Sequence, residues 1–182
     1  MKSLKYKSIL ICLIFSCYLQ AQCELEVNKD GFAGSKHVET SYKWLSQNGS
    51  TYVSSRISSF YDGTPHIQLV VRFFGSEHFY IDKKHEVIFN FKDMEPIRKN
   101  NFIRTGAKKS KEGTYRSVVY TIPIDEELRN IFLKPKNECA LTKVEFTHSK
   151  GNGESNVKKK YKNTIGDQTK CVYEVSMDWP KK

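Results

Sequence analysis

The sequence predicts a mostly β protein: a single antiparallel β-sandwich or partly open barrel of about eight strands, with one short helix near residues 125–133. Two observations predict this fold class. Apolar and polar residues alternate with a period of two along most of the chain, as in strands that bury one face, and turn-forming residues separate these runs. Helical spacing of apolar residues is clear in only one short stretch, so strands are expected to build the core.

The first two strands follow from alternation. In residues 51–60, Val53 and Ile57 alternate with serines and an arginine. An Asp-Gly-Thr-Pro turn follows. Residues 66–74 then place apolar side chains on one face, and the opposite face, which carries Arg72, is expected to be half exposed.

Residues 79–81 and 86–91 predict a hairpin around a polar turn, and Pro96 predicts that the next segment lies at a sheet edge. His78 and His85 fall on this hairpin. Its expected register separates the two imidazoles by several residues, so both are expected to be surface histidines and not metal ligands.

A strand over residues 114–122 leads to the predicted helix. Asp125 is a suitable N-cap, and apolar residues follow at i, i+3 and i+4 from Leu128. Pro135 ends the helix. Because isolated helices this short are marginal, packing against the sheet is expected to hold it.

The C-terminal part is predicted as two strands, residues 141–146 and 157–165, separated by a Gly-Asn-Gly turn. The tail over residues 167–182 fits two readings. One is a strand from 171 to 177, and the other is an irregular end.

Residues 1–21 have the plan of a secretory signal peptide: lysines, then a short apolar run, then small and polar residues with cleavage expected after Ala21. The run is shorter than the about 20 residues of a membrane span. Residues 22–182 are therefore expected to form one secreted or periplasmic β-rich domain with no transmembrane segment. The alternative is a lipoprotein anchored at Cys17.

Three cysteines remain beyond the leader: Cys23, Cys139 and Cys171. In an oxidising compartment we expect one disulfide among them. Their order does not choose the pair. Cys139 with Cys171 is favoured because both flank the last strands, and Cys23 could replace either. No C-x-x-C spacing exists, so a zinc site built on cysteines is not expected. No other metal site and no cofactor are expected.

The stretch NKDGFAG, residues 28–34, is predicted to be a structural turn rather than a ligand-binding loop. Its aspartate and glycines permit left-handed backbone, and its phenylalanine anchors the turn to a core. The residues of this structural turn are Asp30, Gly31, Phe32 and Gly34.

This stretch, with Cys23 before it, resembles an Asp-x-Phe-Thr-Gly box found in a family of small, uncharacterised secreted proteins of Bacteroidetes-type bacteria. Ala33 stands here where that box has threonine. The resemblance continues through residues 67–91 and through the strand-then-helix step at 120–128. It implies a β-rich fold and brings no known activity.

The chain carries a net charge of +10, and the excess lies in residues 98–182, which hold 19 basic and 10 acidic side chains. If two lysine-rich segments share one side of the fold, they form a patch that attracts an anionic envelope component. Tyr115, Tyr161 and Phe102 could stack beside it. Nucleic acid is disfavoured because no reading module is recognisable. The candidate polyanion-binding residues are Lys108, Lys109, Lys111, Arg116, Lys158, Lys159, Lys160 and Lys162.

No catalytic residue is singled out, because no nucleophile motif has its strand-to-helix context. The sequence therefore predicts a non-catalytic binding or envelope-associated accessory domain. The alternative is a small hydrolase acting on an envelope polymer. A deep cleft lined by converging polar groups would favour the hydrolase, and a flat basic face with exposed aromatic side chains would favour binding.

Overall fold

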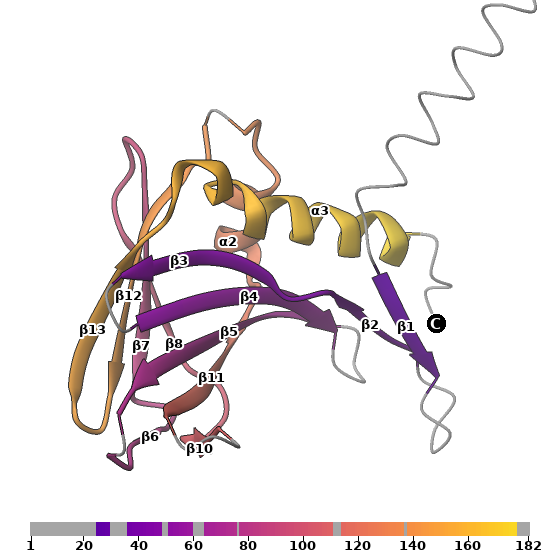
Figure 1. The fold of residues 1–182 in the computed structure, drawn as a ribbon. Helices are drawn as coiled ribbons and strands as arrows, with labels where there is room; N and C mark the ends of the chain where they lie inside the picture. The colour runs from indigo at the N-terminus through magenta and orange to yellow at the C-terminus, as the bar shows by residue number, and fades with distance from the viewer. Residues whose placement is uncertain are drawn as a thin grey trace, which may run out of the picture.

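The computed structural model describes residues 25–29, 36–48, 51–59, 64–75, 77–110, 114–136 and 138–177. Within these ranges the protein is mostly β, with antiparallel sheets in a sandwich-like arrangement that does not close into a barrel (Figure 1). The predicted fold class is confirmed, with two helices where one was expected.

Seven strands form the larger sheet, in the order β1-β2-β4-β5-β11-β10, and β3 pairs with β4 beside β2. β2 pairs near the C-terminal end of β4, where Glu39 lies opposite Ser58, and β3 pairs along its N-terminal part. The strands are β1 (Leu25–Lys29), β2 (Lys36–Thr40), β3 (Lys43–Asn48), β4 (Thr51–Ser59), β5 (Pro65–Phe74), β10 (Lys108–Lys109) and β11 (Tyr115–Pro123).

Four strands form the second sheet, in the order β13-β12-β7-β8. β8 lies at its edge, as Pro96 predicts. A separate two-stranded sheet pairs β6 with β9. The strands are β6 (Tyr80–Ile81), β7 (Glu86–Phe91), β8 (Ile97–Asn100), β9 (Thr105–Gly106), β12 (Leu141–His148) and β13 (Gly151–Asn156).

The hairpin predicted over residues 79–91 is wrong. The turn itself forms, with the His85 N–H donating to the Asp82 carbonyl at 3.1 Å. The two strands then diverge, because Tyr80 pairs with Gly106 while β7 runs between β8 and β12. The turn therefore joins two different sheets.

The core lies between the inner faces of the two main sheets. Ile57 and Tyr120 point inward from the larger sheet, and Phe89 and Phe146 meet them from the second; each is at most 1% exposed. The Tyr120 hydroxyl donates to the Thr147 carbonyl at 2.8 Å, which links the two layers. Burial raises the pKa of Tyr120 well above its ordinary value.

Helix α2 (Glu126–Phe132) forms where the sequence predicts it. Asp125 is the N-cap, and its Oδ1 accepts the Leu128 N–H at 3.0 Å. Leu128, Ile131 and Phe132 are the buried residues of the helix. The Phe132 ring packs edge-on against Phe89 of β7, so tertiary contact holds this two-turn helix in place.

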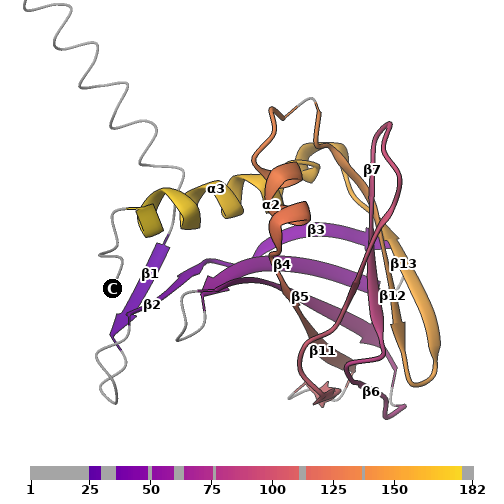
Figure 2. The same cartoon turned by 180° about the vertical axis from the view of Figure 1, so that it is seen from behind.

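Helix α3 (Thr164–Met177) corrects the prediction for the C-terminal part. Residues 157–165 form no strand; they contain the 3-10 turn η1 (Lys159–Tyr161) and the start of α3. Ile165, Thr169 and Val172 recur at helical spacing on the buried side. α3 packs on β2 and β4, beside α2 (Figure 2).

A buried glutamine fastens α3 to the larger sheet. Gln168 is 6% exposed. Its Nε2 donates to Thr40 Oγ1 at 3.1 Å, to the Ser41 carbonyl at 2.9 Å and to the Ser55 carbonyl at 3.1 Å. Its Oε1 accepts the Ser55 hydroxyl at 2.8 Å. Both ends of the amide therefore have partners, which makes its burial tolerable.

Cys139 is a buried free thiol, so the favoured Cys139–Cys171 disulfide is wrong. It lies in the loop after α2, where its Sγ is 3.4 Å from the Pro135 carbonyl oxygen, and burial raises the pKa of the thiol. Cys171, on α3, is disulfide-bonded. Cys23, the remaining candidate, lies outside the described residues.

The expectations for the N-terminal part also lie outside the described residues. They concern the leader, residues 1–21, and the structural turn at Asp30, Gly31, Phe32 and Gly34. The strands on either side of that turn, β1 and β2, pair antiparallel. In the part of the chain that the structure describes, no helix has the length and apolar character needed to cross a membrane.

Candidate functional site

The outward side of the larger sheet carries exposed aromatic side chains. On β4, Val53 and Ile57 point into the core, so alternation turns Tyr52 outward. Trp44 on β3 is 47% exposed and Phe74 on β5 is 59% exposed. We call the set Trp44, Tyr52, Phe74 and Tyr115, together with Arg72, the aromatic face.

The four rings of the aromatic face contact one another in a chain. Ring centroids are 6.0 Å apart for Trp44 and Tyr52, 6.0 Å for Tyr52 and Tyr115, and 5.2 Å for Tyr115 and Phe74. All three contacts are edge-to-face, the arrangement that the ring quadrupole favours. The contacts hold the rings together as one platform across β3, β4, β5 and β11.

A β-bulge in β3 brings Trp44 and Gln47 to the same side. Trp44 lies opposite Ser54, and Ser46 lies opposite the adjacent Val53, so β3 has one extra residue here. Leu45 and Ser46 are both buried in consequence, whereas Trp44 and Gln47 are exposed. The bulge thus adds the Gln47 amide to the edge of the aromatic face.

Arg72 is the cation in the middle of the aromatic face. It lies opposite Tyr52 on one side and Ser117 on the other, and its guanidinium carbon is 5.9 Å from the Trp44 ring centroid. Arg72 is exposed, and among the described residues no carboxylate forms an ion pair with it. Its charge is therefore available to an anionic ligand.

The neighbouring arginine, Arg56, is held by protein groups. Its Nη1 is 2.7 Å from Glu39 Oε2, and its Nε donates to Gln68 Oε1 at 2.7 Å. The guanidinium covers the Tyr42 ring at 4.5 Å. Burial raises the pKa of Tyr42 although Arg56 opposes this. The two arginines thus differ: Arg56 is neutralised in place and Arg72 is not.

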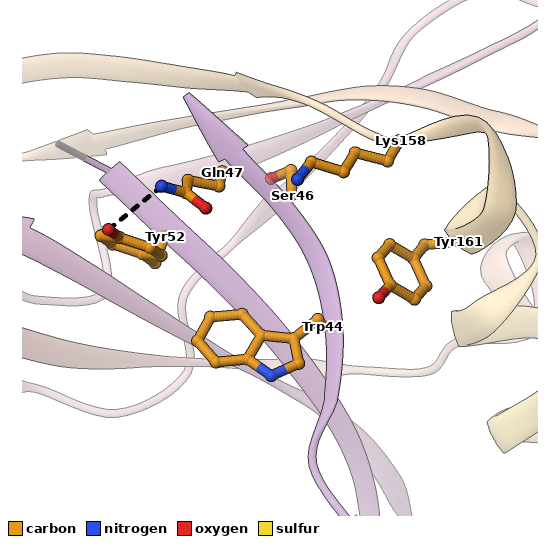
Figure 3. A pocket seen from close by; sticks show the side chains of 6 residues that line it. All are labelled: Trp44, Ser46, Gln47, Tyr52, Lys158 and Tyr161. Carbon is orange, nitrogen blue, oxygen red and sulfur yellow. Dashed lines mark hydrogen bonds between the residues drawn. The ribbon is translucent and has the colours of Figure 1, made fainter. Parts of the chain in front are cut away.

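A pocket of about 230 Å³ opens at the β3 end of the aromatic face (Figure 3). Gln47 Nε2 donates to the Tyr52 hydroxyl at 3.1 Å, and the Ser46 and Ser155 hydroxyls are 2.6 Å apart. In Figure 3 the Lys158 side chain points toward Ser46 of β3. The pocket combines aromatic walls, neutral hydrogen-bonding groups and one ammonium group. Its lining residues are Trp44, Ser46, Gln47, Tyr52, Lys158 and Tyr161.

One group of the predicted polyanion-binding lysines lies beside this pocket. The Lys158 N–H donates to the Leu45 carbonyl at 3.2 Å, which attaches the segment to β3. Lys159 and Lys160 are exposed on η1, and Lys160 Nζ lies 4.8 Å from the Tyr161 ring centroid. The fourth lysine of this group, Lys162, is half-buried.

The other predicted group lies at the opposite edge of the sheet. Lys108 and Lys109 form β10, opposite Ser117 and Arg116 of β11 respectively. Paired residues share a face of a sheet, so Lys108 lies on the side of Ser117 and Arg72, while Lys109 and Arg116 lie on the other side. Lys111 is outside the described residues. The basic residues therefore form two separate groups, with the aromatic face between them.

The predicted stacking residues are also separated. Tyr115 belongs to the aromatic face, and Tyr161 lines its pocket. Phe102 packs instead against His66, with ring centroids 5.7 Å apart.

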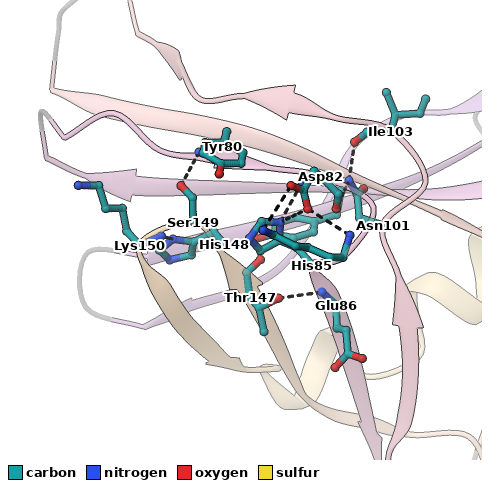
Figure 4. A network of polar contacts seen from close by, with 12 residues as sticks. Tyr80, Asp82, His85, Glu86, Asn101, Ile103, Thr147, His148, Ser149 and Lys150 are labelled. Carbon is teal, nitrogen blue, oxygen red and sulfur yellow. Dashed lines mark hydrogen bonds and ion pairs between the residues drawn. The ribbon is translucent and has the colours of Figure 1, made fainter.

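A second polar cluster lies where the turn between β6 and β7 meets β12 (Figure 4). Asp82 Oδ1 is 2.7 Å from His85 Nδ1. His85 is 7% exposed, so the prediction of a surface histidine is wrong for His85, while His78 is exposed as predicted. Asn101 accepts a backbone N–H of β11 at 2.8 Å. Burial and the nearby His85 lower the pKa of His148.

The contacts of this cluster tie the turn to the neighbouring strands. Its side chains accept hydrogen bonds from backbone N–H groups of β7, β11 and the turn itself. Across the described ranges, no group of three or more His, Cys, Asp or Glu side chains is placed to hold a metal ion. The cluster therefore has the features of a structural network.

Comparison of the chain with known proteins finds no matching family model, curated protein or solved structure. The functional argument consequently depends on the geometry of the aromatic face and its pocket.

Proposed function

We propose that the protein is a secreted or periplasmic, non-catalytic binding domain that holds an anionic envelope component on its aromatic face. The observation that carries the proposal is the contact chain of four aromatic rings around Arg72, with two of the rings at least 47% exposed. A contiguous exposed patch of large apolar side chains usually marks an interaction site, and a surface that serves only solubility rarely carries one.

Charge supports an anionic ligand. Arg72 has no carboxylate partner among the described residues, and exposed lysines stand at both edges of the aromatic face: Lys158 near β3 and Lys108 on β10. A positive field at both ends and in the middle attracts an anion along the whole platform. The leader over residues 1–21 supports a location outside the cytoplasm.

The pocket favours binding over the alternative, a small hydrolase. Its lining of Trp44, Ser46, Gln47, Tyr52, Lys158 and Tyr161 includes no carboxylate, imidazole or thiol. General acid and base catalysis on a polymer linkage depends on such groups. The Ser46 hydroxyl is bonded to Ser155 and has no base beside it in the lining.

Retention on a heparin column tests the proposal. Changing Lys158, Lys159 and Lys160 together to glutamine removes the cations at the β3 edge, so we expect elution at a lower salt concentration. The matched control changes Lys83, Lys84 and Lys92 to glutamine, three exposed lysines on the turns before and after β7. Equal losses of retention in the two triple variants would show that net charge alone drives binding and would refute the site.

A further inference from the structure

A second group of exposed apolar side chains lies where the segment after β8 meets the turn before β7. Tyr80 on β6 is 38% exposed, and Phe102 and Ile103 are 48% and 37% exposed. The pairing of β6 with β9 brings the two segments together. Phe102 and Ile103 are adjacent in the chain, so a strand that buries every second residue would hide one of them. We call the set Tyr80, Lys83, Phe102, Ile103 and Arg104 the loop surface.

A buried amide holds the backbone that carries Phe102 and Ile103. Asn101 is 2% exposed. Its Nδ2 donates to the carbonyl oxygens of Asp82, at 3.3 Å, and of Ile103, and its Oδ1 accepts the Thr121 N–H at 2.8 Å. In Figure 4 the Ile103 side chain points away from Asn101. Because the amide has partners at both ends, the exposure of the two apolar side chains belongs to a fixed conformation of the loop.

Positive charge lies beside these apolar side chains. Lys83 Nζ is 5.6 Å from the Phe102 ring centroid, and the Arg104 guanidinium carbon is 5.2 Å from the Tyr80 ring centroid. Both cations are exposed, and among the described residues no carboxylate forms an ion pair with either. The single acid of residues 80–85 and 101–106, Asp82, lies within 4.0 Å of two basic side chains of its own turn. The loop surface therefore presents unpaired cations around an apolar centre.

We propose that the loop surface docks on an anionic lipid membrane, with Phe102 and Ile103 inserted among the lipid chains. Both side chains lack hydrogen-bonding groups and gain free energy on leaving water. Tyr80 combines an apolar ring with a hydroxyl, which suits the headgroup level where tyrosine is enriched. Lys83 and Arg104 then contact lipid phosphates, because the negative potential of such a membrane attracts basic residues near its surface.

The loop surface differs in composition from the aromatic face. Its centre includes an aliphatic side chain, Ile103, which offers a carbohydrate neither an aromatic ring nor a hydrogen bond. Lipid chains cover aliphatic and aromatic side chains alike, and the anionic headgroups above them meet the two cations. The two surfaces share no residue, so this inference does not rest on the proposed function.

Co-sedimentation with vesicles tests the inference. The probes are vesicles of phosphatidylcholine alone and vesicles of phosphatidylcholine and phosphatidylglycerol in equal amounts. The protein is produced with Gln22 as its first residue, so that neither the leader nor an acylated Cys17 can bind the vesicles. We expect binding to the mixed vesicles to be at least about tenfold tighter, since each of the two cations contributes about fivefold at an anionic surface.

A serine variant of the apolar centre tests insertion. Phe102→Ser with Ile103→Ser should weaken binding to the mixed vesicles about tenfold, because the exposed fractions of the two side chains together nearly equal one whole side chain. The matched control is Tyr42→Ser with Leu133→Ser, an aromatic and an aliphatic side chain that are 44% and 38% exposed. It should bind vesicles as the parent does. Heparin has no hydrocarbon layer, so Phe102→Ser with Ile103→Ser should keep the parent's retention on heparin.

A glutamine variant of the two cations tests the phosphate contacts. Lys83→Gln with Arg104→Gln should weaken binding to the mixed vesicles at least about tenfold. The matched control is Lys92→Gln with Arg129→Gln, two exposed residues on the turn after β7 and on α2. Both of these elements lie away from β6 in the two views of the fold (Figures 1 and 2). This control should keep the parent's affinity.

Several outcomes would overturn the inference. Equal binding to the two kinds of vesicle, or binding to neither, does so, and so does a loss in a control variant that matches the loss in its loop-surface counterpart. Weakening by the glutamine variant alone would show adsorption by charge without insertion of Phe102 and Ile103. Loss of heparin retention in the serine variant would assign these side chains to a polyanion site and not to a membrane. None of these outcomes affects the heparin test of the aromatic face.

Discussion

Replacement of Gln168 by leucine tests how α3 is held on the larger sheet. The side chain is 6% exposed and makes four hydrogen bonds to β2, β4 and the segment after β2. Leucine has a similar volume and none of these bonds, so the variant removes polar contacts without opening a large cavity.

The expected loss in free energy of unfolding comes from the groups that lose their hydrogen-bond partner when Gln168 is replaced. The Ser55 hydroxyl, which is fully buried, and the Ser41 carbonyl both lose a hydrogen bond, while Thr40 Oγ1 still accepts the Ile57 N–H at 2.9 Å. A buried polar group without a partner costs about 1–3 kcal/mol, so the two together cost about 4 kcal/mol, of which the apolar leucine side chain recovers up to about 2 kcal/mol. We expect the free energy of unfolding to fall by about 2–4 kcal/mol.

Urea unfolding of Gln168→Leu, Ser55→Ala and the double variant measures this cost. Removing both partners leaves no unsatisfied hydroxyl, so we expect the double variant to lose less than the sum of the two single variants. An unchanged slope against urea would confirm that the same surface is exposed on unfolding. A loss below about 0.5 kcal/mol for Gln168→Leu, or strictly additive losses, would refute the reasoning.

Three further predictions concern the helix cap, the cysteines and the leader. Burial raises the pKa of Asp125, but the hydrogen bonds from Lys99 and from the Leu128 N–H lower it by more, so this pKa lies below its usual value. The ionised Asp125 therefore stabilises the fold above the unfolded pKa of about 3.9, and this stabilisation is lost as the pH falls through the folded pKa. The difference in free energy of unfolding between the parent protein and Asp125→Asn should shrink between pH 7 and pH 3. A constant difference would contradict this prediction. Because Cys139 is free and Cys171 is disulfide-bonded, peptide mapping without reduction should find Cys171 joined to Cys23, with Cys139 alkylated only after unfolding; a Cys139–Cys171 peptide would contradict this. Mass spectrometry of the exported protein should find Gln22 as the first residue, whereas a lipid-modified Cys17 would show the lipoprotein alternative.

Helix α2 could be predicted from the sequence because all of its signals are local. The cap at Asp125, three apolar residues from Leu128 and the proline after it lie within about a dozen residues. Helix α3 could not, since its buried face includes Gln168 and Thr169 as well as Ile165. Polar residues on the buried face weaken the helical periodicity of apolar residues in the sequence. The hydrogen-bond partners that allow Gln168 to be buried belong to β2 and β4, more than 100 positions earlier in the chain.

Strand positions were predicted better than strand partners. Alternation located β4, β5, β7 and β11, and it placed Arg72 on the exposed face of β5. The pairing of β6 with β9 and of β7 with β12 joins segments that are far apart in the sequence, whereas the turn at residues 82–85 suggested a local hairpin. Alternation reports which side of a strand is buried and carries no information about its neighbour.

No strand is predicted from the sequence at residues 43–48, and the bulge in β3 gives a physical reason why alternation does not reveal this strand. With strict alternation Trp44 and Gln47, three residues apart, would point to opposite faces, and one of them would lie in the core. The extra residue between Trp44 and Ser46 turns both outward while Leu45 is fully buried. Bulges often re-aim a side chain beside a functional site, and this bulge unites an exposed indole with an amide at the edge of the aromatic face. Tyr52, Phe74 and Tyr115 lie on regularly paired strands, and the bulge in β3 adds Gln47 beside Trp44 on the same outward side.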